Sequence, residues 1–406
     1  MNNNSVKNEQ RVANRINTMG ESATLKMAQL ARELTAKGHK VISLSLGEPD
    51  FDTPDHIKEA AIQALKDGFT KYTPVPGIIE LREAICTKLQ RDNNLSFKAS
   101  QIVVSNGAKQ SIANLSLSLL QEGDEAIILS PYWVSYKEII ELSEAKAVFV
   151  EAGIEQDFKI NPTQLKAAIT DKTRMVLFSS PCNPTGSVFS RAELKALADV
   201  IAEYPQIVVV SDEIYEYINF TEQGHCSIAE FESIKERCVV VNGFSKGFAM
   251  TGWRLGYIAA PQWIANACTK IQGQITSGAA AFSQRAAITA LLSDLKPTHE
   301  MTKAFKERRD IFISLLNEIP GFKVNNPQGA FYVFPDVSEL FGKSNGNTVI
   351  RNDEDLCDYL LYTAHVAIVS GAAFGAPNCV RLAYSLGEDD LREAVSRIKK
   401  AVEQLK

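Results

Sequence analysis

The chain runs Val239-Val240-Val241-Asn242-Gly243-Phe244-Ser245-Lys246 past its midpoint, so an apolar run stops abruptly at polar residues and a lysine. A lysine at the carboxyl end of a buried strand can be dry enough to lose its proton, and a neutral amine attacks carbonyl carbons. Arg254 follows in a glycine-rich turn, and an arginine keeps its charge and suits a phosphate. An amine beside a phosphate grip is what a pyridoxal phosphate site requires.

Five further apolar runs surround this one, with amphipathic helical stretches between them. They are Ile102–Val104, Ala126–Leu129, Met175–Phe178, Ile207–Val210 and Leu255–Ile258. Strands that are apolar on both faces and alternate with helices predict a mainly parallel sheet covered on both sides. Polar residues directly follow every run that precedes Leu255. Because ligands bind such sheets at the carboxyl ends of the strands, these exits should line one cleft.

The character of the chain changes after about residue 300. A charged helix at 303–317, a strand at 331–334 and an amphipathic C-terminal helix at 389–405 predict a second, smaller α/β domain. The predicted organisation is an N-terminal arm at 1–20, a large domain at 57–299, and a small domain made of 21–56 and 300–406.

The composition narrows the class of protein. With 406 residues, 45% hydrophobic content and a net charge of −5, the chain has ample core but no basic field for nucleic acid or an acidic membrane. We find no apolar run long enough to cross a bilayer and no signal-peptide layout at the N-terminus. The seven cysteines form no CxxC pair, which is typical of reduced thiols in the cytoplasm. Five scattered histidines predict no metal site.

The strand exits carry side chains that suit a charged planar ligand. Asp212 ends an apolar run, and a carboxylate in a dry cleft needs a cation such as a protonated pyridine nitrogen. The alternative for Asp212 is a helix N-cap. The hydroxyl of Tyr215 and the amide of Asn183, which stands between two prolines, could reach the ring oxygen of the same ligand. Aromatic packing and a structural turn are their respective alternatives.

Three more residues have a ligand-binding and a structural interpretation. Gly107 precedes a helix, where backbone N–H groups could meet a phosphate, but ordinary strand-to-helix turns look the same. Trp133 could stack on a planar ring or pack in the core. Arg381 lies in an apolar run and needs an anionic partner, which is either a substrate α-carboxylate or an internal salt bridge.

Taken together and in order, these blocks resemble the fold-type I pyridoxal phosphate aminotransferases of the aspartate aminotransferase class (class I/II). The resemblance runs from about Thr24 to the C-terminus. Its blocks are Leu46–Phe51, Lys71–Pro74 with Gly77, Asn106–Lys109, Ser130–Trp133, Pro181–Gly186, Ser211–Tyr215, Ser245–Lys246 with Arg254, and Val380–Arg381. Each block alone is weak, but their order is highly specific.

The resemblance implies a large domain with a mainly parallel seven-stranded sheet, a smaller α/β domain, and a homodimer with shared active sites. It implies that Lys246 is the Schiff-base lysine and the base that moves the α-proton. The implied cofactor contacts are Asp212, Asn183, Tyr215, Trp133, Arg254, Gly107, Ala108, Lys109 and, from a neighbouring subunit, Tyr72. The implied substrate contacts are Arg381 for the α-carboxylate, together with Gly47, Thr24, Lys109, Trp133 and Asn183.

Two positions bear on the details of the implied site. Many relatives have a hydroxyl residue three positions before the lysine, which touches the phosphate, but this chain has Gly243 there. Ser245 does not take over that role by default. Lys109 matches the residue that meets the substrate's distal carboxylate in one branch of the family. Prephenate-using members of that branch look similar at Thr24 and Lys109.

The expected activity is a ping-pong transamination, L-aspartate with 2-oxoglutarate giving oxaloacetate and L-glutamate. A glutamate/aspartate-prephenate aminotransferase is the first alternative. A β-eliminating lyase can share the fold and the cofactor contacts, but Lys109 favours a dicarboxylate substrate. A pyridoxal-binding transcription regulator would carry a DNA-binding module ahead of this fold, and the N-terminal arm is too short and too weakly basic for one.

Overall fold

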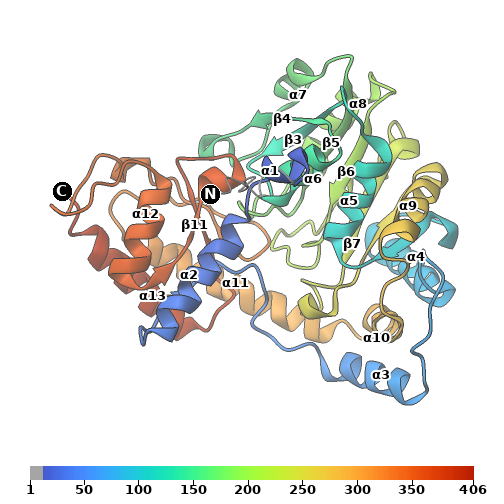
Figure 1. Ribbon diagram of the computed structural model, residues 1–406, viewed down its shortest axis with the longest axis horizontal. Helices are drawn as coiled ribbons and strands as arrows, with labels where there is room; N and C mark the ends of the chain where they lie inside the picture. Colours follow the sequence, from blue (N-terminus) through green and yellow to red (C-terminus); the bar gives the residue numbers. More distant parts are fainter. Residues whose placement is uncertain (1–11) are drawn as a thin grey trace, which may run out of the picture.

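The computed structural model describes residues 12–406, and its centre is a seven-stranded sheet with the strand order β2-β8-β7-β6-β5-β3-β4 (Figure 1). The strands are β2 Ile102–Ser105, β3 Glu125–Ser130, β4 Lys146–Glu151, β5 Thr173–Ser179, β6 Val208–Asp212, β7 Cys238–Gly243 and β8 Gly256–Ala259. Only β8 runs antiparallel to its neighbours. The mainly parallel sheet predicted from the apolar runs is confirmed.

The edge strand β4 is absent from the sequence prediction. It reads Lys-Ala-Val-Phe-Val-Glu, pairs with β3 alone, and leaves most of its residues partly or fully exposed. The inner strands β3, β6 and β7 are buried at every position. Because β4 is partly exposed along its length, it carries no continuous apolar run of the kind that reveals the fully buried strands, among them the other edge strand β2.

Helices cover both faces of the sheet. Along β7, Val240 packs into the core that contains α4, α8 and α10, whereas Val239 and Val241 pack into the core that contains α5, α6 and α9. The alternation follows from the two-residue period of a strand. These helices span Ile79–Asn93 (α4), Ala108–Leu119 (α5), Ser135–Leu142 (α6), Arg191–Ala202 (α8), Gln262–Ile275 (α9) and Ala281–Leu292 (α10), with α3 Asp55–Lys66 and α7 Pro162–Ala168 beside them.

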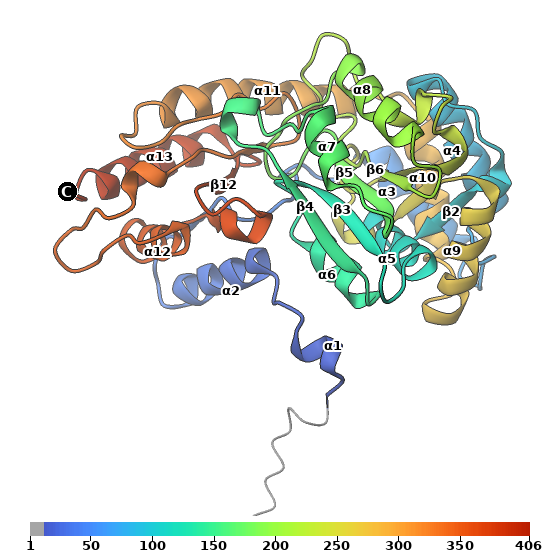
Figure 2. The same ribbon diagram turned by 90° about the horizontal axis from the view of Figure 1, so that it is seen from above.

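A second group of elements lies to one side of the large sheet (Figures 1 and 2). They share a separate hydrophobic core and are α2 Ala23–Ala36, α11 Lys296–Leu316, α12 Asp353–Tyr359, α13 Glu388–Val402, the parallel pair β1 Ile42–Ser43 and β10 Val366–Ala367, and the antiparallel pair β12 Val380–Ala383 and β9 Tyr332–Val333. Strand β11 Val369–Ser370 pairs with β12, but Val369 packs into a smaller neighbouring core. We propose that these elements define the smaller domain, residues 21–56 and 300–406, and that 57–299 form the large one.

The predicted N-terminal arm falls partly outside the described residues, at 1–11. Its remainder contains the short helix α1, Asn14–Asn17, and runs along α6. There the backbone N–H of Gly20 donates to Glu138 at 2.9 Å, and Arg15 lies 3.7 Å from Glu144. In the part of the chain from residue 12 onward, no helix is long and apolar enough to cross a membrane. All seven cysteines are free thiols.

Candidate active site

The strand exits of the large sheet meet at one cavity of about 310 Å³. Lys246 follows β7, Asp212 ends β6, Asn183 follows β5, Trp133 follows β3, and Ala108 opens the helix after β2. Arg381 from β12 also lines this cavity. The cleft expected from the polar strand exits is therefore present, and it brings together most of the residues predicted from the sequence.

Lys246 presents its amine to this cavity. Its Nζ donates to the carbonyl of Gly47 at 2.5 Å. Burial lowers the pKa of Lys246 to about 8; Glu48 acts to raise it, while the charges of Arg381 and Arg254 act with the burial. A substantial fraction of the amine is therefore neutral near pH 8, and a neutral amine is the form that acts as a nucleophile or base.

Asp212 is a buried carboxylate held by two donors. The hydroxyl of Tyr136 donates to its Oδ2 at 2.7 Å, and the backbone N–H of Ile214 donates to its Oδ1 at 3.2 Å. Burial raises the pKa of Asp212 to about 6 despite these hydrogen bonds. The helix N-cap alternative is wrong, because the residues after Asp212 form turns and no helix. A buried acid at the cavity floor fits a cationic ligand atom.

Arg381 enters the cavity without an acidic partner. Its guanidinium donates to Asn183 Oδ1 at 3.0 Å and to the carbonyl of Ser45 at 2.5 Å. It lies between the rings of Tyr332 and Phe374, with its Cζ 4.6 and 4.8 Å from their centroids. Among residues 12–406, no carboxylate comes within ion-pair distance of Arg381, so the internal salt bridge is wrong. The buried charge is available to an external anion.

Tyr215 and Tyr332 form a buried hydroxyl pair, 2.6 Å apart, at the cavity wall. Burial and the neighbouring Tyr332 raise the pKa of Tyr215 well above its ordinary value, so the phenol stays neutral and can donate. A Cβ at Gly47 would collide with the hydroxyl of Tyr332. Glycine at position 47 therefore lets the backbone carbonyl reach Lys246 while Tyr332 occupies the space in front of it.

One corner of the cavity concentrates positive charge. Gly107 has φ +85°, and a Cβ there would lie 2.5 Å from Nη2 of Arg254, so only glycine lets this arginine approach. Helix α5 begins at the next residue, Ala108, and its first N–H groups lack partners within the helix. Burial, with the nearby charge of Arg254, lowers the pKa of Lys109. Such a corner suits a phosphate.

The remaining sequence candidates differ in where they lie. Thr24 and Gly47 line the cavity, and Lys109 lies with its Nζ 4.9 Å from the Trp133 ring centroid. Tyr72 lies outside the cavity with 99% of its surface exposed, so its predicted phosphate contact requires a second subunit. The position of the missing hydroxyl, Gly243, has no room for a side chain, because a Cβ would come within 2.9 Å of Gly256 and of the carbonyl of Leu255. Ser245 does line the cavity.

Sequence reasoning missed several residues that shape the site. Tyr136 lies in the first turn of α6, and Trp133 stands just before that helix, so no helical spacing connects the two residues in the sequence. Tyr332 lies within the predicted strand at 331–334, but its neighbours in space come from distant parts of the chain. Glu48 and Thr251 hydrogen-bond each other at the cavity wall; Glu48 lies in the block Leu46–Phe51, but no role was predicted for either side chain.

Residues 39–398 match the family model of the class I and II aminotransferases. The chain is 46% identical over 396 residues to the bifunctional aspartate aminotransferase and glutamate/aspartate-prephenate aminotransferase of Petunia hybrida, covering 97% of this chain and 83% of that protein. It is 44% identical over 395 residues to the aspartate aminotransferase of Bacillus subtilis, covering 97% and 99%. The aspartate aminotransferase structure from Rhizobium meliloti superimposes with a TM-score of 0.94 at 40% identity, covering 97% and 99%. The resemblance seen in the sequence is confirmed, and the chain belongs to the class I and II aminotransferases.

Proposed function

We propose that this aminotransferase uses pyridoxal phosphate to move an amino group between L-aspartate and 2-oxoglutarate, giving oxaloacetate and L-glutamate. One observation carries the proposal. Two cations without acidic partners among the described residues, Arg381 and Lys109, face the cavity that also holds the amine of Lys246. A dicarboxylic amino acid has two carboxylates to meet them and an amino group between them.

The residues present fit pyridoxal phosphate. The corner formed by Arg254 and the start of α5 offers charge and N–H groups to the phosphate, and a side chain at Gly107 would block it. Asp212 would face the ring nitrogen, Tyr215 and Asn183 the ring oxygen, and Trp133 the ring face. At rest Lys246 would hold this cofactor covalently; once the amine of the amino acid has taken the place of Lys246, the cofactor would supply an electron sink for the α-carbon and leave the Lys246 amine free.

The protein's own groups then orient the substrate and move its proton. Arg381 holds the α-carboxylate, and its place between two aromatic rings fixes the direction of its N–H groups. Lys246 Nζ takes the proton from the α-carbon, for which its lowered pKa provides a neutral amine near pH 8. Asp212 remains ionised opposite a cation. Two half-reactions on one site predict ping-pong kinetics.

Prephenate is the second candidate acceptor. Curated relatives from Nitrosomonas europaea and Cereibacter sphaeroides, each 44% identical, are named aspartate/prephenate aminotransferases. Thr24 and Lys109, the positions at which prephenate-using relatives look similar, both line the cavity. The cavity also includes Ser22 and Leu25 from the same N-terminal segment, which leaves a wall that could meet a larger acceptor. A β-eliminating lyase acts on a substrate that need not carry a distal carboxylate, so the charge of Lys109 favours the aminotransferase.

A panel of acceptors tests the choice of substrate. Rates with oxaloacetate, 2-oxoglutarate, prephenate, pyruvate and aromatic oxo acids are compared for the parent and for Lys109→Met, which keeps the side-chain length without the charge. We expect kcat/KM for the dicarboxylates to fall about 10- to 100-fold, the effect of one charge-assisted contact, with little change for pyruvate. Equal loss for acidic and neutral acceptors would remove Lys109 from the distal-carboxylate site.

We further propose a homodimer located in the cytoplasm. Tyr72 supports the dimer, because it is almost fully exposed and lies away from the cavity of its own subunit. The phosphate contact that the resemblance implies for Tyr72 could then be made only in the cavity of a second subunit. Seven free thiols support a reducing compartment. The expected mass in solution is about twice 44.6 kDa, which light scattering during gel filtration measures directly.

A further inference from the structure

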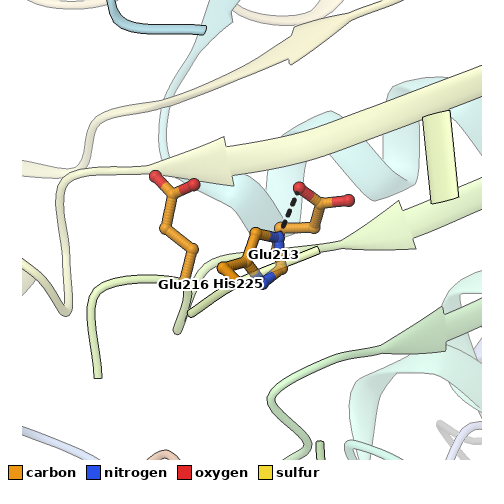
Figure 3. Close-up of side chains that lie close together, drawn as sticks. All are labelled: Glu213, Glu216 and His225. Carbon is orange, nitrogen blue, oxygen red and sulfur yellow. Dashed lines mark hydrogen bonds and ion pairs between the residues drawn. The ribbon is translucent and has the colours of Figure 1, made fainter. Parts of the chain in front are cut away.

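The turn after β6 carries a second set of polar side chains on its far side from the cavity. Asp212 and Tyr215 line the cavity, whereas Glu213 and Glu216 make their contacts behind it. Figure 3 shows Glu213 beside His225, with Glu216 close to both. Their ligating atoms lie within 4.8 Å of one another, a spacing that would also suit a metal ion.

The contacts of Glu216 tie the turn to helix α4. Lys88 forms an ion pair with Glu216 and donates to Asn93 Oδ1 at 2.7 Å. Asn93 in turn donates to Glu216 Oε2 at 3.0 Å. All three side chains are buried, and Lys88 has no exposed surface. The ammonium and the carboxylate therefore have each other, and one amide, in place of water.

Glu213 is also buried, and both of its carboxylate oxygens have hydrogen-bond partners. Its Oε1 accepts from Ser211 at 2.9 Å and from Ser227 at 2.6 Å. Its Oε2 pairs with His225 Nε2 at 2.9 Å. Burial alone would lower the pKa of His225, but the facing carboxylate of Glu213 outweighs it and the pKa is raised. His225 with Glu213 and Lys88 with Glu216 therefore form two adjacent buried pairs.

A metal ion does not fit this arrangement. Both oxygens of Glu216 already have donors in Lys88 and Asn93, and both oxygens of Glu213 are taken by hydroxyls and His225. A divalent ion here would also face the ammonium of Lys88 at close range in a dry interior, where like charges repel strongly.

The turn after β6 has few backbone hydrogen bonds of its own, so its side chains must help to fix its geometry. Glu213 N–H donates to the carbonyl of Val241 in β7 at 2.8 Å, and beyond it the turn has two single-turn hydrogen bonds, Glu216 N–H to Glu213 at 2.9 Å and Ile218 N–H to Tyr215 at 2.8 Å, and no helix. Apolar side chains of similar size often give a buried site equal or greater stability than an ion pair. Charged side chains specify one geometry, which a residue that must meet a cofactor atom requires.

We propose that this group is a clamp that positions Asp212 and Tyr215 for the cofactor, an inference that rests on the proposed function. The clamp consists of Lys88, Asn93, Glu213, Glu216 and His225. None of these residues lines the cavity. They act on the reaction through Asp212, the last residue of β6, and Tyr215 in the turn that follows it, because a shift of Glu213 or Glu216 displaces the backbone next to those two residues.

Two variants separate positioning from stability. Lys88→Met leaves Glu216 buried and unpaired, so we expect a lower thermal midpoint of the apo protein and weaker binding of pyridoxal phosphate. Lys88→Met/Glu216→Leu replaces both charges with apolar groups. We expect the double variant to regain the thermal midpoint, while its dissociation constant for pyridoxal phosphate stays raised by about tenfold and the absorbance spectrum of the bound cofactor titrates at a shifted pH.

The matched control is the exposed pair Lys166–Glu203, 2.7 Å apart, replaced as Lys166→Met/Glu203→Gln, for which no change is expected. A double clamp variant with parental cofactor affinity and parental spectrum would overturn the proposal, even if Lys88→Met alone fails to fold. A zinc ion bound stoichiometrically by the parent and lost in His225→Gln would also overturn it. A parent that binds no pyridoxal phosphate at all would instead refute the proposed function.

Discussion

At the scale of single residues, the cavity holds two groups, Lys246 and Asp212, whose pKa values are shifted in opposite directions. Burial lowers the pKa of Lys246 to about 8, which favours the neutral amine. Burial raises the pKa of Asp212 to about 6, so its ionised form gains from a cationic partner. Desolvation disfavours the charged form of both groups. A ligand with a protonated ring nitrogen and an aldehyde satisfies both groups at once, which neither water nor a metal ion does.

The lowered pKa of Lys246 predicts how fast the apo protein captures the cofactor. Only the neutral amine attacks the aldehyde, so the capture rate should rise with pH and level off above a midpoint of about 8. Stopped-flow absorbance measures the rate, and borohydride followed by peptide mapping identifies the labelled lysine. Lys246→Ala should lose the label and the absorbance band. A midpoint near 10.5, the ordinary value for lysine, would contradict the dry environment.

The hydrogen bond from Tyr136 predicts a pH-dependent stability. Asp212 has a higher pKa folded than unfolded, so the folded protein binds more protons and its free energy of unfolding falls as pH rises from about 4 to 6. The shift corresponds to about 3 kcal/mol. Tyr136→Phe removes a donor to the ionised form, which raises this pKa further. We expect a loss of about 1.5 to 3 kcal/mol at pH 8 and a smaller loss at pH 5.

Urea unfolding of the apo protein at the two pH values measures the effect of Tyr136→Phe. Tyr384→Phe is the matched control, because this buried hydroxyl donates to the carbonyl of Ala330 at 3.1 Å and touches no acid. Its cost should be the same at both pH values. If Tyr136→Phe behaved in the same way, the hydroxyl of Tyr136 would have no influence on the ionisation of Asp212.

At the scale of elements, the junction of β2 and α5 makes the phosphate corner. Gly107→Ala would bring a Cβ against Arg254 and place alanine at a strained φ of +85°. We expect the dissociation constant for pyridoxal phosphate to rise by about tenfold or more. Gly123→Ala is the control, because Gly123 has φ +90° with nothing within 4 Å of the added Cβ. Both variants should lose stability, and only Gly107→Ala should lose cofactor affinity.

Elements also show how far sequence reasoning reaches. The inner strands and the positions of Lys246 and Asp212 at their ends were predictable, because burial on both faces demands continuous apolar runs. The edge strand β4 was not, because its residues are largely exposed and form no continuous apolar run, unlike those of the buried edge strand β2. The place of Arg381 between Tyr332 and Phe374, without an acidic partner among residues 12–406, depends on segments far apart in the chain. No local pattern records such contacts.

At the scale of the whole molecule, the exposed Tyr72 predicts shared active sites. Subunits carrying Lys246→Ala and subunits carrying Tyr72→Ala should each form weakly active or inactive homodimers. Mixed dimers of the two should regain one intact site, because an unaltered Tyr72 then faces an unaltered Lys246 across the interface. Activity and cofactor content of the purified mixed dimer measure this. Mixed dimers no more active than the average of the two homodimers would place the action of Tyr72 within its own subunit.

One wall of the cavity comes from the beginning of the described chain, where Ser22, Thr24 and Leu25 lie across from the strand exits. Leu25 remains 65% exposed, and the segment just before it is held against α6 mainly by the contact of Gly20 with Glu138. A smaller side chain at position 25 therefore widens the reaction chamber without entering either large core. Leu25→Ala can be expected to rank bulky and compact acceptors differently from the parent while melting at the same temperature.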